Sequence, residues 1–492
     1  MNSKPVLDRR RAGVLLHPTS LPNGIGNGDL GADAHRFVDF LAQTGFTVWQ
    51  MLPLGPTHDD ASPYHSLSVH AANPLLIGLA PLAQSGWLER DDCLGASVDP
   101  TAHRCACLRK ARQRFLARAG AEDRQALAAF VAAESAWLED YALYQALRAE
   151  FQRAPWWTWS AGLRDRNAGA LAAARERLTE ALAQVRFEQF LFDRQWQLLR
   201  THADEKGVLL FGDMPIFVAH DSVDIWVQRE YFALDAEGQP TAMAGVPPDY
   251  FSREGQRWGN PLYDWGRMQA DDFRWWTARL ATELDRFDLV RVDHFRGFEA
   301  CWEIPAADET AANGRWVQVP GAALFDTLLK HFGTLPLVAE DLGHITPAVH
   351  ALRERYGFPG MRVLQFAFDG GTDNPYLPHN HSVNSVVYTG THDNDTTLAW
   401  FQGLAPDGQQ YVVDYLGHPG EPMPQPLLRA ALASVARLAM LPMQDVLMLG
   451  PGHRMNTPGT AAGNWRWRFG WEQVHDGLAQ RLRRLIRLYG RE

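Results

Sequence analysis

Residues 289–298 read LVRVDHFRGF, a short β-branched run that ends in charged residues. Side chains along a strand point alternately to opposite faces, so Arg291 and Asp293 share one face and the two valines share the other. Apolar runs of this length are typical of parallel strands that lie under helices. The valines then pack beneath the helices, and we expect Arg291 and Asp293 to point inward near the carboxyl end of the strand.

Further runs of this kind recur along the chain, and most of them end in polar residues. They cover 13–16, 48–52, 208–211, 337–339, 362–366, 386–388 and 446–449. Helical patterns lie between several of them, for example at 33–44 and 271–286. Buried strands that alternate with helices predict a parallel sheet, and eight of them predict an α/β fold of the (β/α)₈ TIM-barrel type. Such barrels place their chemistry at the carboxyl ends of the strands.

The segment between the second and third predicted strands is longer than one crossover helix requires. Residues 104–150 and 168–203 are rich in Ala, Leu, Arg and Glu at helical spacing, and PWWTW at 155–159 separates them. We therefore expect mainly helical insertions in the barrel, with one at about 80–203 and a loop insertion over the active site at about 225–270. No repeat or obvious linker interrupts the chain, so residues 1–492 are expected to form a single catalytic barrel unit.

Composition excludes several classes of function. The net charge of −10 argues against a nucleic-acid surface. Four scattered cysteines form neither a disulfide framework nor a zinc-ligand pattern. The N-terminal apolar stretch is shorter than a signal-peptide core, and no run approaches a membrane span. We expect a cytoplasmic protein without a metal, a cofactor or a membrane partner.

A second candidate acid, Glu340, follows the strand at 337–339 and shares a face with Val338. Neighbouring strands lie about 4.8 Å apart, so acids at the same height on adjacent strands lie near the roughly 5–5.5 Å that retaining glycosidases use. One acid can then attack the anomeric carbon while the other protonates the leaving oxygen. The alternative to a catalytic role for Asp293 is that Arg291 and Asp293 form a buried pair that only stabilises the barrel.

The acid after Glu340, Asp341, points outward, where we expect it to cap the following helix.

A third cluster, YTGTHDNDT at 388–396, follows the strand at 386–388. His392 and Asp393 are placed to bind sugar hydroxyls, which stabilises an oxocarbenium-like transition state. We expect Asp395 to cap a helix. A two-metal hydrolase is the alternative for this string, but no histidine-rich partner motif accompanies it.

A match to GxGxxG, GNGDLG at 26–31, lacks both the strand directly before it and the acidic residue about 20 positions later that a dinucleotide site requires. We interpret it as a glycine-rich loop over the active site.

Taken together, these motifs resemble the amylomaltases, the 4-α-glucanotransferases of glycoside hydrolase family 77, over nearly the whole chain. The resemblance also includes HPTSLPNGIGNGDLG at 17–31, WQMLPLGPT at 49–57, FGDMPIFVAHDSVDIW at 211–226, AGVPPDYFSREGQRWGNPLYDW at 244–265 and NTPGTAAGNWRWR at 456–468. It implies that Asp293 is the nucleophile, Glu340 the general acid/base and Asp393 the transition-state stabiliser.

The resemblance also implies a set of substrate-binding residues. Those around the cleaved glucose are Tyr64, Asp213, Arg291 and His392. A loop over the acceptor side carries Tyr250, Phe251, Gln256 and Trp258. Asn464 is expected to reach the sugar as well, and Trp258 is alternatively an anchor of its loop.

The implied activity is transfer of α-1,4-glucan segments to glucose or to another maltodextrin. Two other functions remain open on the residues alone. A plain α-1,4-glucan hydrolase would use the same three carboxylates, and a catalytically silent barrel would only bind carbohydrate. The implied partners are α-1,4-glucans and malto-oligosaccharides. The chain departs from some members of the family at HDDA, residues 58–61, where they carry an aromatic residue of a remote glucan-binding site.

Overall fold

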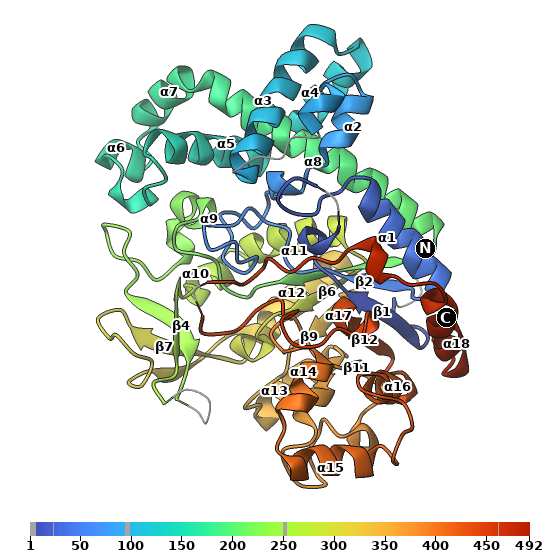
Figure 1. Ribbon diagram of the computed structural model, residues 1–492. Helices are drawn as coiled ribbons and strands as arrows, with labels where there is room; N and C mark the ends of the chain where they lie inside the picture. The colour runs from blue at the N-terminus through green and yellow to red at the C-terminus, as the bar shows by residue number, and fades with distance from the viewer. Residues whose placement is uncertain (1–5, 23, 94–98, 249–252, 461) are drawn as a thin grey trace.

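The computed structural model describes residues 6–22, 24–93, 99–248, 253–460 and 462–492. Its central strands are β1 (Arg11–Leu15), β2 (Val48–Gln50), β3 (Leu209–Met214), β6 (Leu289–Val292), β9 (Leu337–Ala339), β10 (Gly360–Val363), β11 (Ser385–Tyr388) and β12 (Leu438–Pro442). Within the described residues, these eight parallel strands close into a barrel in the order β1–β12–β11–β10–β9–β6–β3–β2 (Figure 1). The predicted (β/α)₈ fold is confirmed.

The eighth strand was predicted in the wrong place. It is β12, which pairs with β1 from Arg11 opposite Leu438 to Leu15 opposite Pro442 and closes the barrel. Residues 446–449, the predicted strand, instead begin at the end of the short helix α17 (Met443–Val446). A short apolar run is compatible with either a strand or a buried helix, so hydrophobicity alone did not separate the two. The sixth strand, β10, also ends earlier than predicted, because Leu364–Phe366 forms a 3₁₀ turn.

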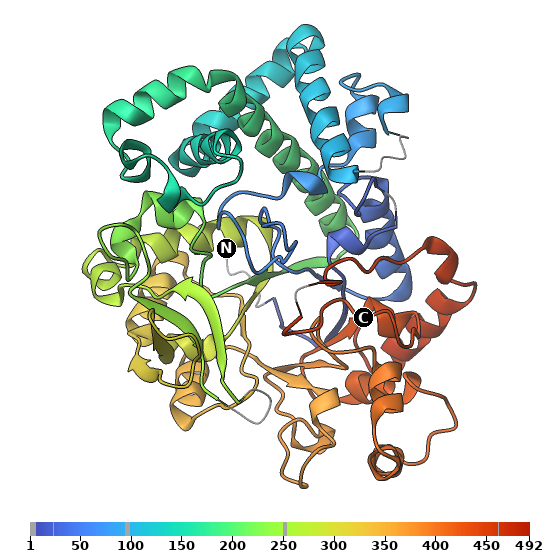
Figure 2. The ribbon, with the colours of Figure 1, turned by 60° about the vertical axis from the view of Figure 1, so that its left-hand side comes forward.

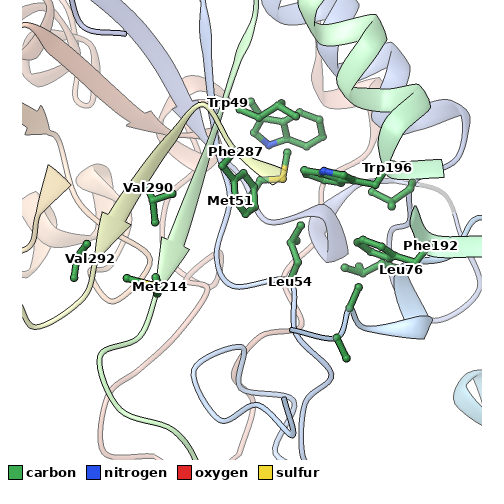
Figure 3. Close-up of a cluster of buried hydrophobic side chains, with 14 of the residues drawn as sticks. Trp49, Met51, Leu54, Leu76, Phe192, Trp196, Met214, Phe287, Val290 and Val292 are labelled. Atoms are coloured by element: carbon green, nitrogen blue, oxygen red, sulfur yellow. The ribbon is translucent and has the colours of Figure 1, made fainter. Parts of the chain in front are cut away.

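The side chains of the barrel strands divide between two hydrophobic clusters, as the alternation in the sequence predicts. One cluster contains side chains from several strands, among them Phe211, Leu289 and Val338. The other lies between the strands and the surrounding helices, and Figure 3 shows Val290 and Val292 in it. The two valines therefore face the helices, and the alternate positions of β6 face the interior.

The chain between β2 and β3 is mainly helical. It contains α2 (Leu79–Gln84), α3 (Pro100–Arg118), α4 (Ala121–Ala133), α5 (Ser135–Glu150), α6 (Ala161–Arg164), α7 (Ala168–Arg177) and α8 (Thr179–Glu205). Helix α8 contacts α3, α4, α5 and α7, and it also contacts β3 and α1 (Ala32–Thr44). It thus connects these helices to the barrel, beside which they project at the top of Figures 1 and 2.

A second sheet lies beside the barrel. It contains β4 (Ala242–Val246), β5 (Gln256–Pro261), β7 (Ala300–Pro305) and β8 (Arg315–Gln318). The strands are antiparallel in the order β5–β4–β7–β8. Two segments on either side of β6 in the sequence therefore meet in one sheet, which sequence analysis did not predict.

The remaining helices cover the barrel or connect its strands. They are α9 (Val223–Val227), α10 (Trp265–Ala270), α11 (Arg274–Arg286), α12 (Gly321–Phe332), α13 (Pro347–Arg355), α14 (Thr397–Gly403), α15 (Pro406–Tyr415), α16 (Gln425–Ala433) and α18 (Leu478–Leu488). Further 3₁₀ turns lie at Pro18–Ser20, Pro74–Leu76, Arg90–Cys93, Trp156–Thr158, Arg229–Tyr231, Phe295–Phe298, Pro378–Asn380 and Trp471–Gln473. Among the described residues, no helix has both the length and the hydropathy that crossing a membrane requires.

Candidate active site

The three predicted acids lie beyond the carboxyl ends of barrel strands. Asp293 directly follows β6, Glu340 directly follows β9, and Asp393 lies in the loop after β11. Strands β6 and β9 are hydrogen-bonded neighbours, and their register pairs Val292 with Ala339. The residues that come next, Asp293 and Glu340, are therefore at equivalent heights on adjacent strands.

Arg291 joins two carboxylates at the end of the barrel. Its Nη1 donates to both oxygens of Asp213, at 2.8 and 2.7 Å, and its Nη2 donates to Oδ1 of Asp293 at 2.7 Å. The hydroxyl of Tyr64 donates to Asp213 at 2.8 Å. The side chains of Arg291 and Asp213 are 7% and 0% exposed, whereas that of Asp293 is 29% exposed. The buried Asp213–Arg291 pair thus supports a carboxylate that remains accessible.

Glu340 is held by the backbone. The N–H of His294 donates to its Oε2 at 2.7 Å, and the N–H of Leu342 donates to its Oε1 at 2.9 Å. Burial raises the pKa of Glu340 to about 7, although Arg291 acts in the opposite direction. A carboxyl group with this pKa exchanges its proton near neutral pH, as a general acid/base must.

Asp341 points away from the catalytic acids, but it does not cap a helix as predicted. It accepts a hydrogen bond of 2.7 Å from the N–H of Met361 and lies 3.3 Å from Nε of Arg353. The N-cap of α13 is instead Thr346. The carboxylate is buried, and it ties β10 and α13 to the end of β9. This role depends on tertiary contacts that the local sequence does not reveal.

The side chain of Asp393 has two polar partners among the described residues. Nδ2 of Asn456 donates to its Oδ1 at 2.6 Å, and Nε2 of His392 lies 3.3 Å from the same oxygen. Desolvation acts to raise the pKa of Asp393, but His392, Asn456 and Arg291 outweigh it and hold the pKa well below its usual range. Asp393 is therefore a hydrogen-bond acceptor at neutral pH, which suits it to bind hydroxyl groups.

Asp395 was also predicted to cap a helix, and this was wrong. The N-cap of α14 is Thr396, whose side chain accepts from the N–H of Ala399 at 3.2 Å. Asp395 accepts a hydrogen bond from the N–H of Thr396 at 2.8 Å. The cap is thus displaced by one residue from the predicted position.

Aromatic rings lie close to these acids. Tyr64 stacks on His392 with ring centroids 5.1 Å apart and an angle of 20°. On β5, Trp258 packs edge-on against His294 at 4.9 Å, and its indole N–H donates to Oε1 of Gln256 at 3.1 Å. Trp258 is nevertheless 37% exposed. It is both anchored to its neighbours and available to a ligand.

An open cleft reaches Asp293. It is lined by Asp60, Ser62, Tyr64, His65, Pro215, Ile216, Phe217, Trp258, Asn260 and Asp293. The lining combines aromatic and aliphatic surfaces with a few polar groups. This mixture suits a pyranose ring, which has apolar faces and a rim of hydroxyl groups.

Of the other predicted site residues, Asn464 hydrogen-bonds within its own loop, and two lie outside the described chain. Asn464 accepts from the N–H of Thr457 at 2.9 Å and donates to the carbonyl of Thr460 at 3.0 Å, so its amide closes its own loop. Tyr250 and Phe251 lie outside the described residues. Within the described part of the chain, no group of three or more His, Cys, Asp or Glu side chains is arranged to hold a metal ion.

Several residues of the site were not predicted from the sequence, among them three that contact the acids or line the cleft beside them. Asn456 bonds to Asp393, His294 supplies a backbone donor to Glu340, and Phe217 lines the cleft. His294 stands beside the predicted nucleophile in the sequence, so its proximity was a usable signal. Phe217 and Asn456 lie in the stretches 211–226 and 456–468 that carry the family resemblance, but the resemblance gave neither residue a role in the site.

The barrel, the cleft and the acids at the ends of its strands together define a TIM-barrel enzyme that acts on carbohydrate. Residues 16–473 match the model of glycoside hydrolase family 77, described as 4-alpha-glucanotransferase. The chain belongs to this family of 4-alpha-glucanotransferases.

Two curated relatives and one solved structure are similar over nearly the whole chain. The 4-alpha-glucanotransferase of Thermus thermophilus is 50% identical over 93% of this chain and 94% of its own length. The enzyme of the same name from Synechocystis is 48% identical over 99% of both chains. The amylomaltase from Streptococcus agalactiae, solved in complex with acarbose, is 37% identical with a TM-score of 0.95, over 98% of this chain and 100% of that one.

Proposed function

We propose that this 4-α-glucanotransferase moves α-1,4-glucan segments by a retaining double displacement. The observation that carries the mechanism is the placement of Asp293 and Glu340 on adjacent strands at the same height. Adjacent strands are about 4.8 Å apart, which is close to the separation of roughly 5–5.5 Å in retaining enzymes. An inverting pair would need a wider gap to hold a water molecule.

In the first displacement, a carboxylate oxygen of Asp293 attacks the anomeric carbon of a glucosyl unit. The glycosidic C–O bond breaks, and Glu340 transfers its proton to the leaving oxygen. Nη2 of Arg291 donates a hydrogen bond of 2.7 Å to Oδ1 of Asp293 and so fixes the position of this carboxylate. Asp393 accepts hydrogen bonds from the sugar hydroxyls, and these strengthen as positive charge develops on the ring.

In the second displacement, the hydroxyl of an acceptor sugar attacks the anomeric carbon. Glu340 takes the hydroxyl proton, the bond to Asp293 breaks, and the carboxylate is released with Glu340 again protonated. Two inversions retain the α configuration. The proposed substrate-binding set holds the glucosyl unit at Asp293 and the acceptor beside it, and it comprises Tyr64, Asp213, Arg291, His392, Gln256, Trp258, Tyr250, Phe251 and Asn464.

Transfer requires that the acceptor outcompete water. Proximity can supply this preference, since effective molarities of about 10⁵ M or more are reached by well-oriented reactants. The β4–β5 segment, with Trp258, and the glycine-rich loop at 24–31 are the proposed devices that exclude water. Trp258 lines the cleft together with Asp293, which supports this role.

We further propose that the substrates are α-1,4-glucans and malto-oligosaccharides, and that the enzyme works in the cytoplasm. The acarbose complex of the Streptococcus agalactiae relative supports an oligosaccharide ligand. We propose that the whole chain acts as one catalytic unit, with the helices between β2 and β3 as an insertion in the barrel and the segment at about 225–270 as a cover for the cleft.

Incubation with maltotriose alone tests this function. Transfer yields glucose and a ladder of longer maltodextrins, while the number of reducing ends stays nearly constant. A rise in reducing ends with each cleavage, without longer products, would identify a hydrolase. Absence of any turnover would leave a carbohydrate-binding barrel.

A further inference from the structure

A polar pair that lines the cleft has no part in the mechanism above. Asp60 and His65 each have a side chain that is 46% exposed, and both line the cleft that reaches Asp293. Nδ1 of His65 lies 2.9 Å from Oδ2 of Asp60, and the N–H of Ser62 donates to Oδ1 of Asp60 at 3.0 Å. The pair belongs to the same loop as Tyr64, which bonds to the core of the site.

A second histidine packs against the Asp60–His65 pair. The ring of His65 stacks on that of His58, with centroids 4.0 Å apart and an angle of 17°. Burial lowers the pKa of His58 to about 4, so this ring is neutral near pH 7 and the stack carries no charge repulsion between two imidazolium ions. Arg148 of α5 lies 3.5 Å from His58 and donates twice to Asp221. Helix α5 of the insertion therefore contacts this loop at His58.

The carboxylate of Asp60 has acceptor capacity left for a ligand. Among the described residues, each oxygen accepts one hydrogen bond, whereas an ionised carboxylate offers about four lone-pair sites. Desolvation acts to raise the pKa of Asp60, but the hydrogen bonds from His65 and Ser62 outweigh it, and the pKa is lowered. Asp60 is thus an anion that can accept sugar hydroxyls and repel a negatively charged group.

We propose that Asp60 and His65 bind hydroxyl groups of a neutral glucosyl unit next to the one held at Asp293, and that Asp60 disfavours units that carry a phosphate. The proposal rests on the proposed glucan transfer, because it assigns a specificity-determining role at the same cleft.

Asp59 provides a matched control. It precedes Asp60 in the chain, its side chain is 75% exposed, and it pairs with Arg153 rather than lining the cleft. Asp60→Asn, Asp60→Ala, His65→Ala and Asp59→Asn are each combined with Asp293→Ala, which blocks turnover. Isothermal titration calorimetry then measures the Kd for maltohexaose and for maltohexaose phosphorylated on one glucosyl unit. Thermal unfolding checks that each variant is folded.

Loss of a charge-assisted hydrogen bond raises the Kd of the Asp60→Ala protein for maltohexaose about tenfold, and Asp59→Asn leaves it within about twofold. An unchanged Kd in both Asp60→Ala and His65→Ala would overturn this inference and leave the proposed function standing. An equal loss of affinity in Asp59→Asn would do the same. Asp60→Asn lowers the ratio of the Kd for phosphorylated maltohexaose to the Kd for maltohexaose. An unchanged ratio would show that Asp60 does not discriminate against phosphate. If the Asp293→Ala parent binds no maltodextrin, the proposed function fails as well.

Discussion

Nδ2 of Asn456 donates a hydrogen bond of 2.6 Å to Oδ1 of Asp393. The backbone N–H of Asn456 also donates to the carbonyl of His392 at 3.2 Å. Asn456 follows β12, whereas His392 and Asp393 follow β11, so one loop fixes the position of the other. The proposed transition-state stabiliser is therefore oriented by a residue 63 positions away in the sequence.

Replacement of Asn456 tests this positioning role. Asn456→Ala leaves Asp393 without its short donor, so we expect kcat to fall about 10–100-fold with a smaller change in KM. Asn384→Ala is the control, because Asn384 precedes β11 and donates to the carbonyl of Gly357 at 3.0 Å, away from the acids. Steady-state kinetics with maltotriose give kcat and KM for both variants. A kcat within twofold of wild type for Asn456→Ala would show that His392 alone orients Asp393.

Asp293→Ala tests the nucleophile. The covalent intermediate cannot form, so we expect activity to fall by about 10⁴-fold or more. The fold should persist, because Arg291 retains its pair with Asp213 and the Asp293 side chain is partly exposed. Activity assays and thermal unfolding give the two measurements. Wild-type turnover in a folded variant would exclude Asp293 as the nucleophile.

The pKa of Glu340 predicts the basic limb of the activity profile. Its pKa is raised to about 7, and a general acid acts in its protonated form, so the rate should fall as the pH rises through this value. An activated donor, whose leaving group needs no proton, still reacts with Glu340→Gln in the first displacement. Burst kinetics with this donor should show no basic limb in the variant. Persistence of the limb would assign it to another group.

Trp258→Ala tests the exclusion of water. Removing this ring opens the cleft beside Asp293, so we expect a larger share of hydrolysis, seen as more reducing ends per cleavage of maltotriose. Trp316 on β8 is a matched control, since it is 38% exposed against 37% for Trp258 but does not line the cleft. An equal ratio of transfer to hydrolysis in both variants would indicate that Trp258 only anchors its strand.

Arg104 provides a test of stability. Its buried guanidinium pairs with Asp29 of the glycine-rich loop at 3.0 Å and bonds to the carbonyl of Ile77 at 2.8 Å. Arg104→Ala leaves these acceptors without that donor, and we expect a loss of roughly 3–5 kcal/mol in the free energy of unfolding. The exposed Arg153–Asp59 pair is the control, for which Arg153→Ala should cost about 0–1 kcal/mol. Denaturant unfolding compares the two, and similar losses would contradict the prediction.

The sequence alone determined the (β/α)₈ fold class and the face of the strand on which Asp293 and Glu340 lie, but not the position of the eighth strand. Strand side chains alternate strictly, so valines at 290 and 292 that face the helices require Arg291 and Asp293 to face the interior. Glu340 follows from the same alternation on the next strand. Local periodicity is sufficient here, because the face of a strand is set by its own backbone geometry.

Only the tertiary structure decided the eighth strand, the second sheet and the partners of the acids. Residues 438–442 and 446–449 are both apolar, and it is the ladder with β1 that selects the first as the strand. Strands β4 and β7 pair directly, although β6 lies between them in the sequence. Asn456 reaches Asp393 from another loop. These contacts join segments far apart in the chain. Their free energy depends on closure of the whole barrel, so no local pattern encodes them.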